Sequence, residues 1–260
     1  MILDPINAIT SVEFYRKVAA QTVGRSLLYL VYLSALFSIA GTLALKMKIG
    51  PVVDETFVWL ERSMPTITFE GGKLSTKDQL PVTIRHPRIP EVAVKIDTVS
   101  TGTVTAQTLE AAKVVAYVTR DAMFLMERPG EMRSFDFSTA AAGKPVVIDG
   151  AFYRNAGMLL SRALLPISLA LTFVIFLAWK TFSTFFYSLI ALMVNAVAEG
   201  DLSYKSLFNL TLYAQTLTIA IQAIFLFMPV GLPAAPLVAM ALTTTYLWLA
   251  VKRLVEPPAA

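Results

Sequence analysis

Four polar, uncharged residues recur at helical spacing in a stretch of the chain that has no charged residue. Thr211, Gln215, Thr218 and Gln222, called the polar stripe below, follow one another at steps of four, three and four, which places them on one face of a helix. Glutamine in hydrocarbon must find a hydrogen-bonding partner, so this face is expected to meet another helix or a wet cavity instead of lipid. Two interpretations stay open: interhelical hydrogen bonding and the lining of a substrate path.

Two further segments are candidate binding surfaces. Asp97 and Thr98 end a predicted strand and start a loop rich in Ser, Thr and Gly. Such loops carry binding groups in many proteins, but the same side chains also stabilise turns by local hydrogen bonds. Ser203, Tyr204 and Lys205 lie in the break before the polar stripe, where they form a candidate cytoplasmic docking turn or a helix cap.

The inventory of reactive side chains argues against an enzyme. The chain has no cysteine and one histidine, His86, which is expected at the surface, so thiol chemistry and multi-histidine metal sites are excluded. A serine nucleophile would have a single candidate base, and neither a nucleophile elbow nor a phosphate-binding loop is present. We therefore expect no catalytic residue, no metal site and no cofactor.

The composition indicates what kind of protein positions these residues. Of 260 residues, 56% are hydrophobic and 15% are charged, whereas an average soluble domain is about a quarter charged. Residues 46–162 hold 15 of the 22 basic and 13 of the 18 acidic residues. This distribution predicts an integral membrane protein with one water-soluble portion, and the net charge of +4 does not indicate a nucleic-acid partner.

Uncharged runs locate the membrane helices. Residues 26–45 are long enough to cross one bilayer core of about 30 Å, and the basic residues before them are expected to hold the N-terminus in the cytoplasm. Residues 4–22 resemble an amphipathic helix on the membrane surface. The run at 206–251 is divided by three prolines and a glycine, which predicts a helical hairpin.

The number of crossings depends on the region around Lys180, which interrupts an apolar stretch between residues 163 and 198. One long helix through Lys180 gives four crossings, and a tight hairpin there gives five. No glycine or proline lies at 175–185 to make a turn, so four crossings are favoured and five remain the alternative.

The soluble portion, residues 49–157, is predicted to be a compact and mostly antiparallel β-rich domain outside the cytoplasm. Alternation of apolar and polar residues at period two, with many β-branched side chains, is typical of half-buried strands. A hairpin turn is expected at residues 70–73, and residues 51–62 are expected to be helical. The predicted strands are residues 66–69, 80–85, 91–97, 113–119, 122–127 and 132–138.

These assignments divide the chain into six parts. They are a cytoplasmic amphipathic N-terminus (1–25), transmembrane helix 1 (26–48), the extracytoplasmic β-rich domain (49–157), transmembrane helix 2 with a cytoplasmic extension (158–200), transmembrane helix 3 (201–228), and a turn with transmembrane helix 4 and a cytoplasmic tail (229–260).

Several motifs occur in an order that resembles a known family. They are Met64-Pro-Thr-Ile-Thr-Phe-Glu-Gly-Gly-Lys-Leu74, Leu80-Pro-Val-Thr-Ile84, Val94-Lys-Ile-Asp97-Thr98, Val118-Thr-Arg-Asp121 and Leu202-Ser-Tyr-Lys-Ser-Leu-Phe208 followed by Tyr213-Ala214. Together they resemble the bacterial domain-of-unknown-function family 1189, which includes proteins labelled as maltodextrin utilisation proteins. The resemblance implies an inner-membrane protein with an extracytoplasmic domain and no established activity. The last hairpin is also similar to Yip1-like membrane proteins.

The sequence therefore predicts an α+β membrane protein with four, or alternatively five, transmembrane helices and a β-rich extracytoplasmic domain between the first and the second. The favoured function is a non-enzymatic accessory or scaffold component of a bacterial inner-membrane complex, with sugar transport as the process that the resemblance implies. The alternative is a small transporter or channel-like component that uses the polar stripe. Expected partners are the lipid bilayer and other membrane proteins or further copies of the chain.

Overall fold

The computed structural model describes residues 2–76, 81–86, 89, 91–100, 102–139, 145–229 and 234–255. The chain forms two compact units. The membrane unit comprises Met1–Lys48 and Leu164–Ala260, and the β-rich unit comprises Ile49–Ala163. The predicted strand start at Leu80 and residues 230–233 of the proline-rich turn before the last helix lie outside the described residues.

Within the part of the chain that the structure describes, four helices are long and apolar enough to cross a membrane, which confirms the predicted α+β membrane class. The third of these is made of α6 and α7, which join at Gln215. The four helices are α3 (Val23–Ser63), α5 (Gly150–Val197), α6 with α7 (Tyr204–Ala214 and Thr216–Phe225) and α8 (Ala235–Val255).

The helix α5 continues without interruption through Lys180. The five-crossing alternative, which needs a hairpin at this position, is therefore not what the structure shows. Antiparallel packing of α5 on α3 brings the rings of Phe37 and Phe176 into a stack with centroids 3.8 Å apart. Close approach continues at Gly41, where an added Cβ would lie 3.2 Å from a methyl group of Thr172.

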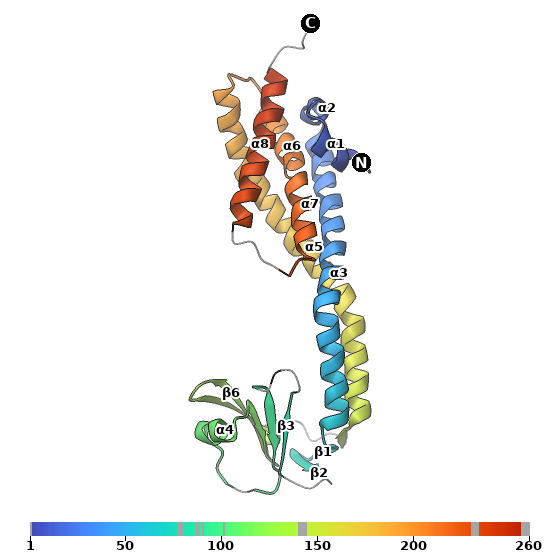
Figure 1. The fold of residues 1–260 in the computed structure, drawn as a ribbon, viewed down its shortest axis with the longest axis vertical. Helices are drawn as coiled ribbons and strands as arrows, with labels where there is room; N and C mark the ends of the chain where they lie inside the picture. Colours follow the sequence, from blue (N-terminus) through green and yellow to red (C-terminus); the bar gives the residue numbers. More distant parts are fainter. Residues whose placement is uncertain are drawn as a thin grey trace. The chain divides into compact units, whose positions relative to one another are not determined.

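The N-terminal segment folds onto the helical bundle instead of forming one surface helix. Two short helices, α1 (Asp4–Thr10) and α2 (Phe14–Ala20), pack against α6, α7 and α8 (Figure 1). Ala8, Tyr15 and Val18 are buried in the bundle core. The prediction of a single amphipathic helix over residues 4–22 is wrong, because the segment forms two helices and buries three of its apolar side chains against helices that follow much later in the chain.

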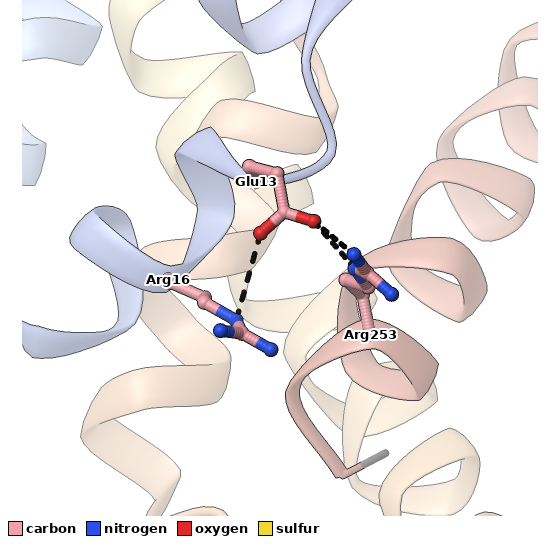
Figure 2. A network of polar contacts seen from close by, with 3 residues as sticks. All are labelled: Glu13, Arg16 and Arg253. Atoms are coloured by element: carbon pink, nitrogen blue, oxygen red, sulfur yellow. Dashed lines mark hydrogen bonds and ion pairs between the residues drawn. The ribbon is translucent and has the colours of Figure 1, made fainter. Parts of the chain in front are cut away.

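An ion-pair network ties α2 to the end of α8. Glu13, at the N-cap of α2, receives a hydrogen bond of 2.6 Å from Nε of Arg253 and also pairs with Arg16 at 3.7 Å (Figure 2). A second link joins α8 to α1, since the hydroxyl of Tyr246 donates to the carbonyl of Ile9 at 2.9 Å. These contacts hold the first and last described helices together at one end of the membrane unit.

The β-rich unit contains two sheets. A three-stranded sheet has the order β2-β1-β8, and a five-stranded sheet has the order β3-β4-β5-β6-β7. The strands are β1 (Ile67–Glu70), β2 (Lys73–Thr76), β3 (Val82–Arg85), β4 (Ala93–Ile96), β5 (Ala116–Val118), β6 (Ala122–Arg128), β7 (Glu131–Asp136) and β8 (Val146–Ile148).

The expected hairpin between β1 and β2 is present, with Glu70 opposite Lys73. Both central residues, Gly71 and Gly72, have positive φ, as a two-residue hairpin turn requires. The expected, mostly antiparallel pairing is confirmed, with β4 and β5 as a parallel pair. Their crossover contains α4 (Ala106–Ala112), which the sequence analysis did not predict.

His86 is buried, which corrects the expectation of a surface histidine. Its ring lies 5.0 Å from that of Trp59 in an edge-on contact, and its Nδ1 accepts a hydrogen bond from the backbone N–H of Ile89. Because Trp59 belongs to α3, His86 fastens the end of β3 to that helix within the β-rich unit. This structural role accounts for a polar side chain at a buried position.

The helical part of the β-rich unit is an antiparallel pair made of residues 49–63 of α3 and 150–163 of α5. The predicted helix at 51–62 is thus a continuation of α3 and not a separate element. The two segments approach most closely at Gly157, where an added Cβ would lie 2.8 Å from Phe57. An ion pair of 2.7 Å between Arg154 and Glu61 lies beside this contact.

The close approach predicts opposite effects for two glycine substitutions. Gly157→Ala should lower the stability of the protein by about 1–3 kcal/mol, because the new methyl group overlaps the Phe57 ring. Gly24→Ala, where nothing lies within 4 Å of the new Cβ, should leave stability unchanged or raise it by up to about 1 kcal/mol. Thermal unfolding of the full chain in detergent measures both. Equal melting temperatures for the two variants would contradict the packing described here.

Candidate functional site

The polar stripe lies at a break in the third membrane helix. Gln215 separates α6 from α7, and side chains bind the carbonyl groups around the break. Gln215 Nε2 donates to the carbonyl of Thr211 at 3.4 Å, and Thr216 Oγ1 donates to that of Tyr213 at 2.6 Å. Backbone groups left without partners are costly in hydrocarbon, so the polar residues permit this irregular helix.

A second polar stripe on α5 faces the first. Lys180, Thr184 and Ser188 are spaced by four residues and are all buried. Gln215 Nε2 donates to Thr184 Oγ1 at 2.9 Å, and this hydroxyl donates in turn to the carbonyl of Lys180 at 2.7 Å. We call the five residues that meet here the polar seam; they are Lys180, Thr184, Ser188, Thr211 and Gln215.

The α5 residues of the seam, Lys180, Thr184 and Ser188, were not among the residues predicted from the sequence. Lys180 was considered only as an interruption between two apolar runs. The spacing of residues 180, 184 and 188 nevertheless places them on one face of a helix, as for the polar stripe. In the structure Lys180 is 5% exposed, and its ammonium lies over the ring of Phe176 at 5.5 Å. Among the described residues it has no anionic partner, which is unusual for a charge inside a helical bundle.

Other buried polar groups of the membrane unit pair across helices. Ser26 on α3 donates to Asn209 on α6 at 2.8 Å, and Tyr29 shares a hydrogen bond of 2.9 Å with Thr216. Thr218 on α7 shares a hydrogen bond of 3.0 Å with Thr243 on α8. These contacts connect α3, α5 and α8 to the third membrane helix, so that helix is the hub of the unit.

The polar stripe is not uniform along its length. Thr211, Gln215 and Thr218 are buried and hydrogen-bonded to neighbouring groups. Gln222 is only half-buried and lines a cavity of about 310 Å³ between α7 and α8. The structure therefore joins Gln215 and Thr218 to other helices, bonds Thr211 within its own helix and places Gln222 in a different environment.

The candidate loop of the β-rich unit turns Asp97 inward. This residue is 2% exposed, and its carboxylate accepts hydrogen bonds from the backbone N–H groups of Val99 and Ser100, the Ser100 hydroxyl and the Tyr117 hydroxyl. Burial opposes ionisation, but the hydrogen bonds from Ser100, Tyr117 and Val99 outweigh it and hold the pKa of this carboxyl below its usual value. Asp97 thus organises the turn.

Thr98, in contrast, lies at the surface of the same loop. It lines an open cavity of about 380 Å³ whose wall also includes Arg120, Asp121 and Phe124. The remaining described lining residues from the two loops are Val99, Ser100, Gly102, Thr103, Val104 and Thr119. Hydroxyl, charged and aromatic groups therefore share one concave surface, which we call the loop cavity.

The candidate docking turn is exposed at the start of α6. Ser203 caps this helix by accepting from the Ser206 N–H at 3.3 Å, while Tyr204 and Lys205 project outward as exposed residues. Asn195 Nδ2 fixes the preceding segment through a bond of 2.9 Å to the carbonyl of Gly200. Capping explains Ser203, and a docking role for Tyr204 and Lys205 stays a prediction.

No set of three His, Asp or Glu side chains within the described residues is arranged to hold a metal ion. The arrangement in the membrane unit instead provides hydrogen bonds that join helices, one buried cation and one half-buried amide. The arrangement in the β-rich unit provides a concave surface next to a rigid turn. Both are features of binding or structural support.

One family model matches this chain over residues 6–251, and its description reads "Protein of unknown function (DUF1189)". No curated protein and no solved structure matches the chain. The family match covers the polar seam, the loop cavity and the docking turn alike.

The seam predicts an energetic coupling between Gln215 and Thr184. In a double-mutant cycle with Gln215→Leu and Thr184→Val, the interaction free energy should be about 0.6–1.7 kcal/mol, as for other hydrogen bonds between membrane helices. Unfolding of the full chain in lipid bicelles measures it. The control pairs Gln215→Leu with Thr245→Val, because the Thr245 hydroxyl is exposed and bonds within its own helix. Additive effects in the Thr184 cycle would disprove the coupling.

The buried carboxylate predicts a pH-dependent stability of the β-rich unit. The folded-state pKa of Asp97 is lowered, so its charge stabilises the fold above an unfolded-state pKa of about 3.9, and this contribution is lost as pH falls through the folded-state value. Asp97→Asn should cost about 1–3 kcal/mol at neutral pH and flatten the dependence below pH ~5. Circular-dichroism melts test this, with the exposed Asp121→Asn as control. A variant that remains as acid-sensitive as the native chain would refute it.

Proposed function

The chain belongs to the DUF1189 family of proteins of unknown function, and we propose that it is a non-enzymatic accessory protein of a bacterial inner-membrane complex. In this proposal the helical unit is the anchor, and the β-rich unit outside the cytoplasm binds the partner. The observation that carries it is the internal pairing of the polar stripe: Gln215 bonds to Thr184, and Thr218 bonds to Thr243.

Hydrogen bonding of the polar stripe within the bundle distinguishes a structural anchor from a protein with a substrate path. A substrate path needs polar groups that face a continuous water-filled space, whereas a structural seam uses them between helices. The three buried stripe residues are at most 4% exposed, and each has a partner within the bundle. The membrane unit thus has the properties of a specifically packed anchor.

The distribution of basic residues supports the proposed orientation. Arg16 and Arg253 meet at Glu13, so α2 and the C-terminal end of α8 lie at the same end of the membrane unit. Lys17 and Lys252 are the sequence neighbours of these two arginines. An excess of Lys and Arg marks the cytoplasmic side of a membrane protein. With four crossings, this orientation puts residues 49–157 on the opposite side of the membrane.

The loop cavity is the proposed contact region of the β-rich unit. Val99 at its rim is 72% exposed, while Asp97 beneath it fixes the turn. The cavity combines hydroxyl groups, the Arg120 and Asp121 side chains and the Phe124 ring, and such groups hydrogen-bond to and stack on sugars. This chemistry supports a complex that handles carbohydrate, as the resemblance implies.

A second candidate function is supported by one observation. The amide oxygen Gln215 Oε1 is buried and has no partner among the described residues, and the buried Lys180 lies one helical turn from Thr184, which contacts this glutamine. The unpaired cation would suit an anionic group of a transported substrate, and the unpaired acceptor would suit a hydrogen-bond donor on the same substrate.

Site-specific crosslinking in native membranes tests the accessory role. A photoreactive amino acid at Val99 should give one discrete adduct with another membrane protein. The same group at Val147, which is 51% exposed on a strand of the other sheet, and at the exposed membrane residue Trp179 should give none. Maltotriose added before illumination should weaken the Val99 adduct if the partner brings carbohydrate to the loop cavity.

Flux into vesicles that contain the purified chain distinguishes the two functions. The accessory role predicts no uptake of maltodextrin or of small organic anions by the chain alone. Uptake that is lost in both Gln215→Leu and Lys180→Met would establish the transporter instead. Absence of any discrete adduct at Val99, with normal membrane insertion, would reject the accessory role.

A further inference from the structure

Basic side chains gather at the end of the membrane unit that holds α2, the start of α6 and the end of α8. Residues 13–25, 199–205 and 252–253 contain six basic and three acidic residues. Glu13 in the first of these segments contacts Arg253 in the last, so charges that are distant in sequence combine in space. The excess is positive, and the basic residues are Arg16, Lys17, Arg25, Lys205, Lys252 and Arg253.

One carboxylate serves two arginines at this end of the unit. Both Nε and Nη2 of Arg253 contact Oε1 of Glu13, whereas Arg16 reaches Oε2 of the same carboxylate through Nε alone, at 3.7 Å (Figure 2). We call these three residues the arginine cluster. Two cations against one anion leave positive charge uncompensated, and Lys17 on α2 adds to it. The Arg16 and Arg253 side chains are 41% and 40% exposed, so this charge is accessible from outside the bundle.

The donors that remain on these arginines suit a phosphate group. A guanidinium group carries several N–H donors in a planar fork, which matches two oxygens of a phosphate. No described residue accepts a hydrogen bond from the Nη groups of Arg16 or from Nη1 of Arg253. An anion with several oxygens can therefore bind to both arginines while Glu13 keeps its own contacts.

The arginine cluster lies at the depth of lipid headgroups. Arg253 comes two residues after the uncharged run 206–251, and Arg25 directly precedes the uncharged run 26–45. Long basic side chains at the ends of membrane helices extend their charged tips into the headgroup region. The anion that this position makes available is therefore the phosphate of a lipid headgroup.

An apolar surface lies nearer the centre of the bilayer than the arginine cluster. The carbonyl of Ile9 on α1 binds Tyr246, which precedes Arg253 by seven residues and hence lies about 10 Å deeper along α8. Consistently, α1 packs on α6 and α7, and α2 packs on α6 and α8 (Figure 1). The depth of α1 is therefore that of lipid acyl chains. Its segment exposes three large apolar side chains, each between 58% and 80% exposed, which are Ile2, Leu3 and Ile6.

We propose that this end of the membrane unit binds a phospholipid whose headgroup has a net negative charge. Arg16 and Arg253 donate to its phosphate oxygens, Lys17 adds attraction, and an acyl chain packs on Leu3 and Ile6. Zwitterionic phospholipids bind less tightly, because their cationic group meets the uncompensated positive charge of the cluster. The site is separate from the loop cavity, and its occupation does not depend on the accessory role.

Lipid competition on the full chain in detergent tests the proposal. Native mass spectrometry compares the bound amounts of phosphatidylglycerol and phosphatidylcholine with identical acyl chains, supplied at equal concentration. Phosphatidylglycerol should be preferred, and Arg16→Gln and Arg253→Gln should each lower its binding about fivefold, which corresponds to about 1 kcal/mol per basic side chain at a membrane surface. The matched control Lys205→Gln removes an exposed charge at the same end of the unit but outside the arginine cluster, and it should have little effect.

Two further variants separate lipid binding from a structural role of the arginines. Glu13→Gln removes the competing negative charge, while its amide oxygen can still accept from Arg253, so binding of phosphatidylglycerol should rise about fivefold. Ile6→Asn should lower the binding of both lipids severalfold, because the acyl contact is common to them. Arg16→Gln carries the test if Arg253→Gln unfolds, since the longer contact of Arg16 contributes little to stability.

Three results would overturn the proposal. Equal binding of the two lipids to the native chain would show that the headgroup charge is not recognised. A loss in Glu13→Gln as large as that in Arg253→Gln would mean that the arginines only fasten α2 to α8. A loss in Lys205→Gln equal to that in Arg16→Gln would assign the preference to general surface charge instead of this site.

Discussion

The absence of water from hydrocarbon is the constraint on which the membrane unit depends. Apolar helix surfaces gain little from leaving lipid for one another, so close packing and hydrogen bonds must provide the preference for one arrangement. The seam meets this need: the amide of Gln215 joins the helix break to Thr184 on α5, and Ser26 joins α3 to Asn209. Ring stacking of Tyr29 on Tyr213, with centroids 3.9 Å apart, adds shape specificity beside these bonds.

The same constraint explains why the seam and the half-buried end of the stripe differ. Where α6 faces α5, the Gln215 amide finds a partner in Thr184, and the helix tolerates a break at Gln215 because side chains bind its free carbonyls. Where α7 faces the small residues of α8, no such partner is in reach of Gln222. One periodic pattern therefore serves two physical purposes along a single helix.

Much of the architecture was predictable from the sequence, and what was not follows from long-range contacts. Apolar runs predicted the membrane helices, and period-two alternation predicted the β1–β2 hairpin, since both patterns reflect local burial. The break at Gln215 has no local signal, because it depends on hydrogen bonds to neighbouring groups. One continuous helix through Lys180 was the favoured prediction and is confirmed, but the burial of this side chain has no local signal, because charge alone does not reveal which residues surround it. The burial of His86 likewise depends on Trp59, which is distant in sequence.

The link between Glu13 and Arg253 has a consequence for biosynthesis. The carbonyl of Ile9 and the carboxylate of Glu13 receive their partners from Tyr246 and Arg253 on α8, which the ribosome makes after the other described helices. The N-terminal helices therefore complete their packing only after the final helix has inserted. Until then the face of α2 that packs on α8 remains uncovered, so an incompletely inserted chain displays near its N-terminal helices a surface that membrane quality control can recognise.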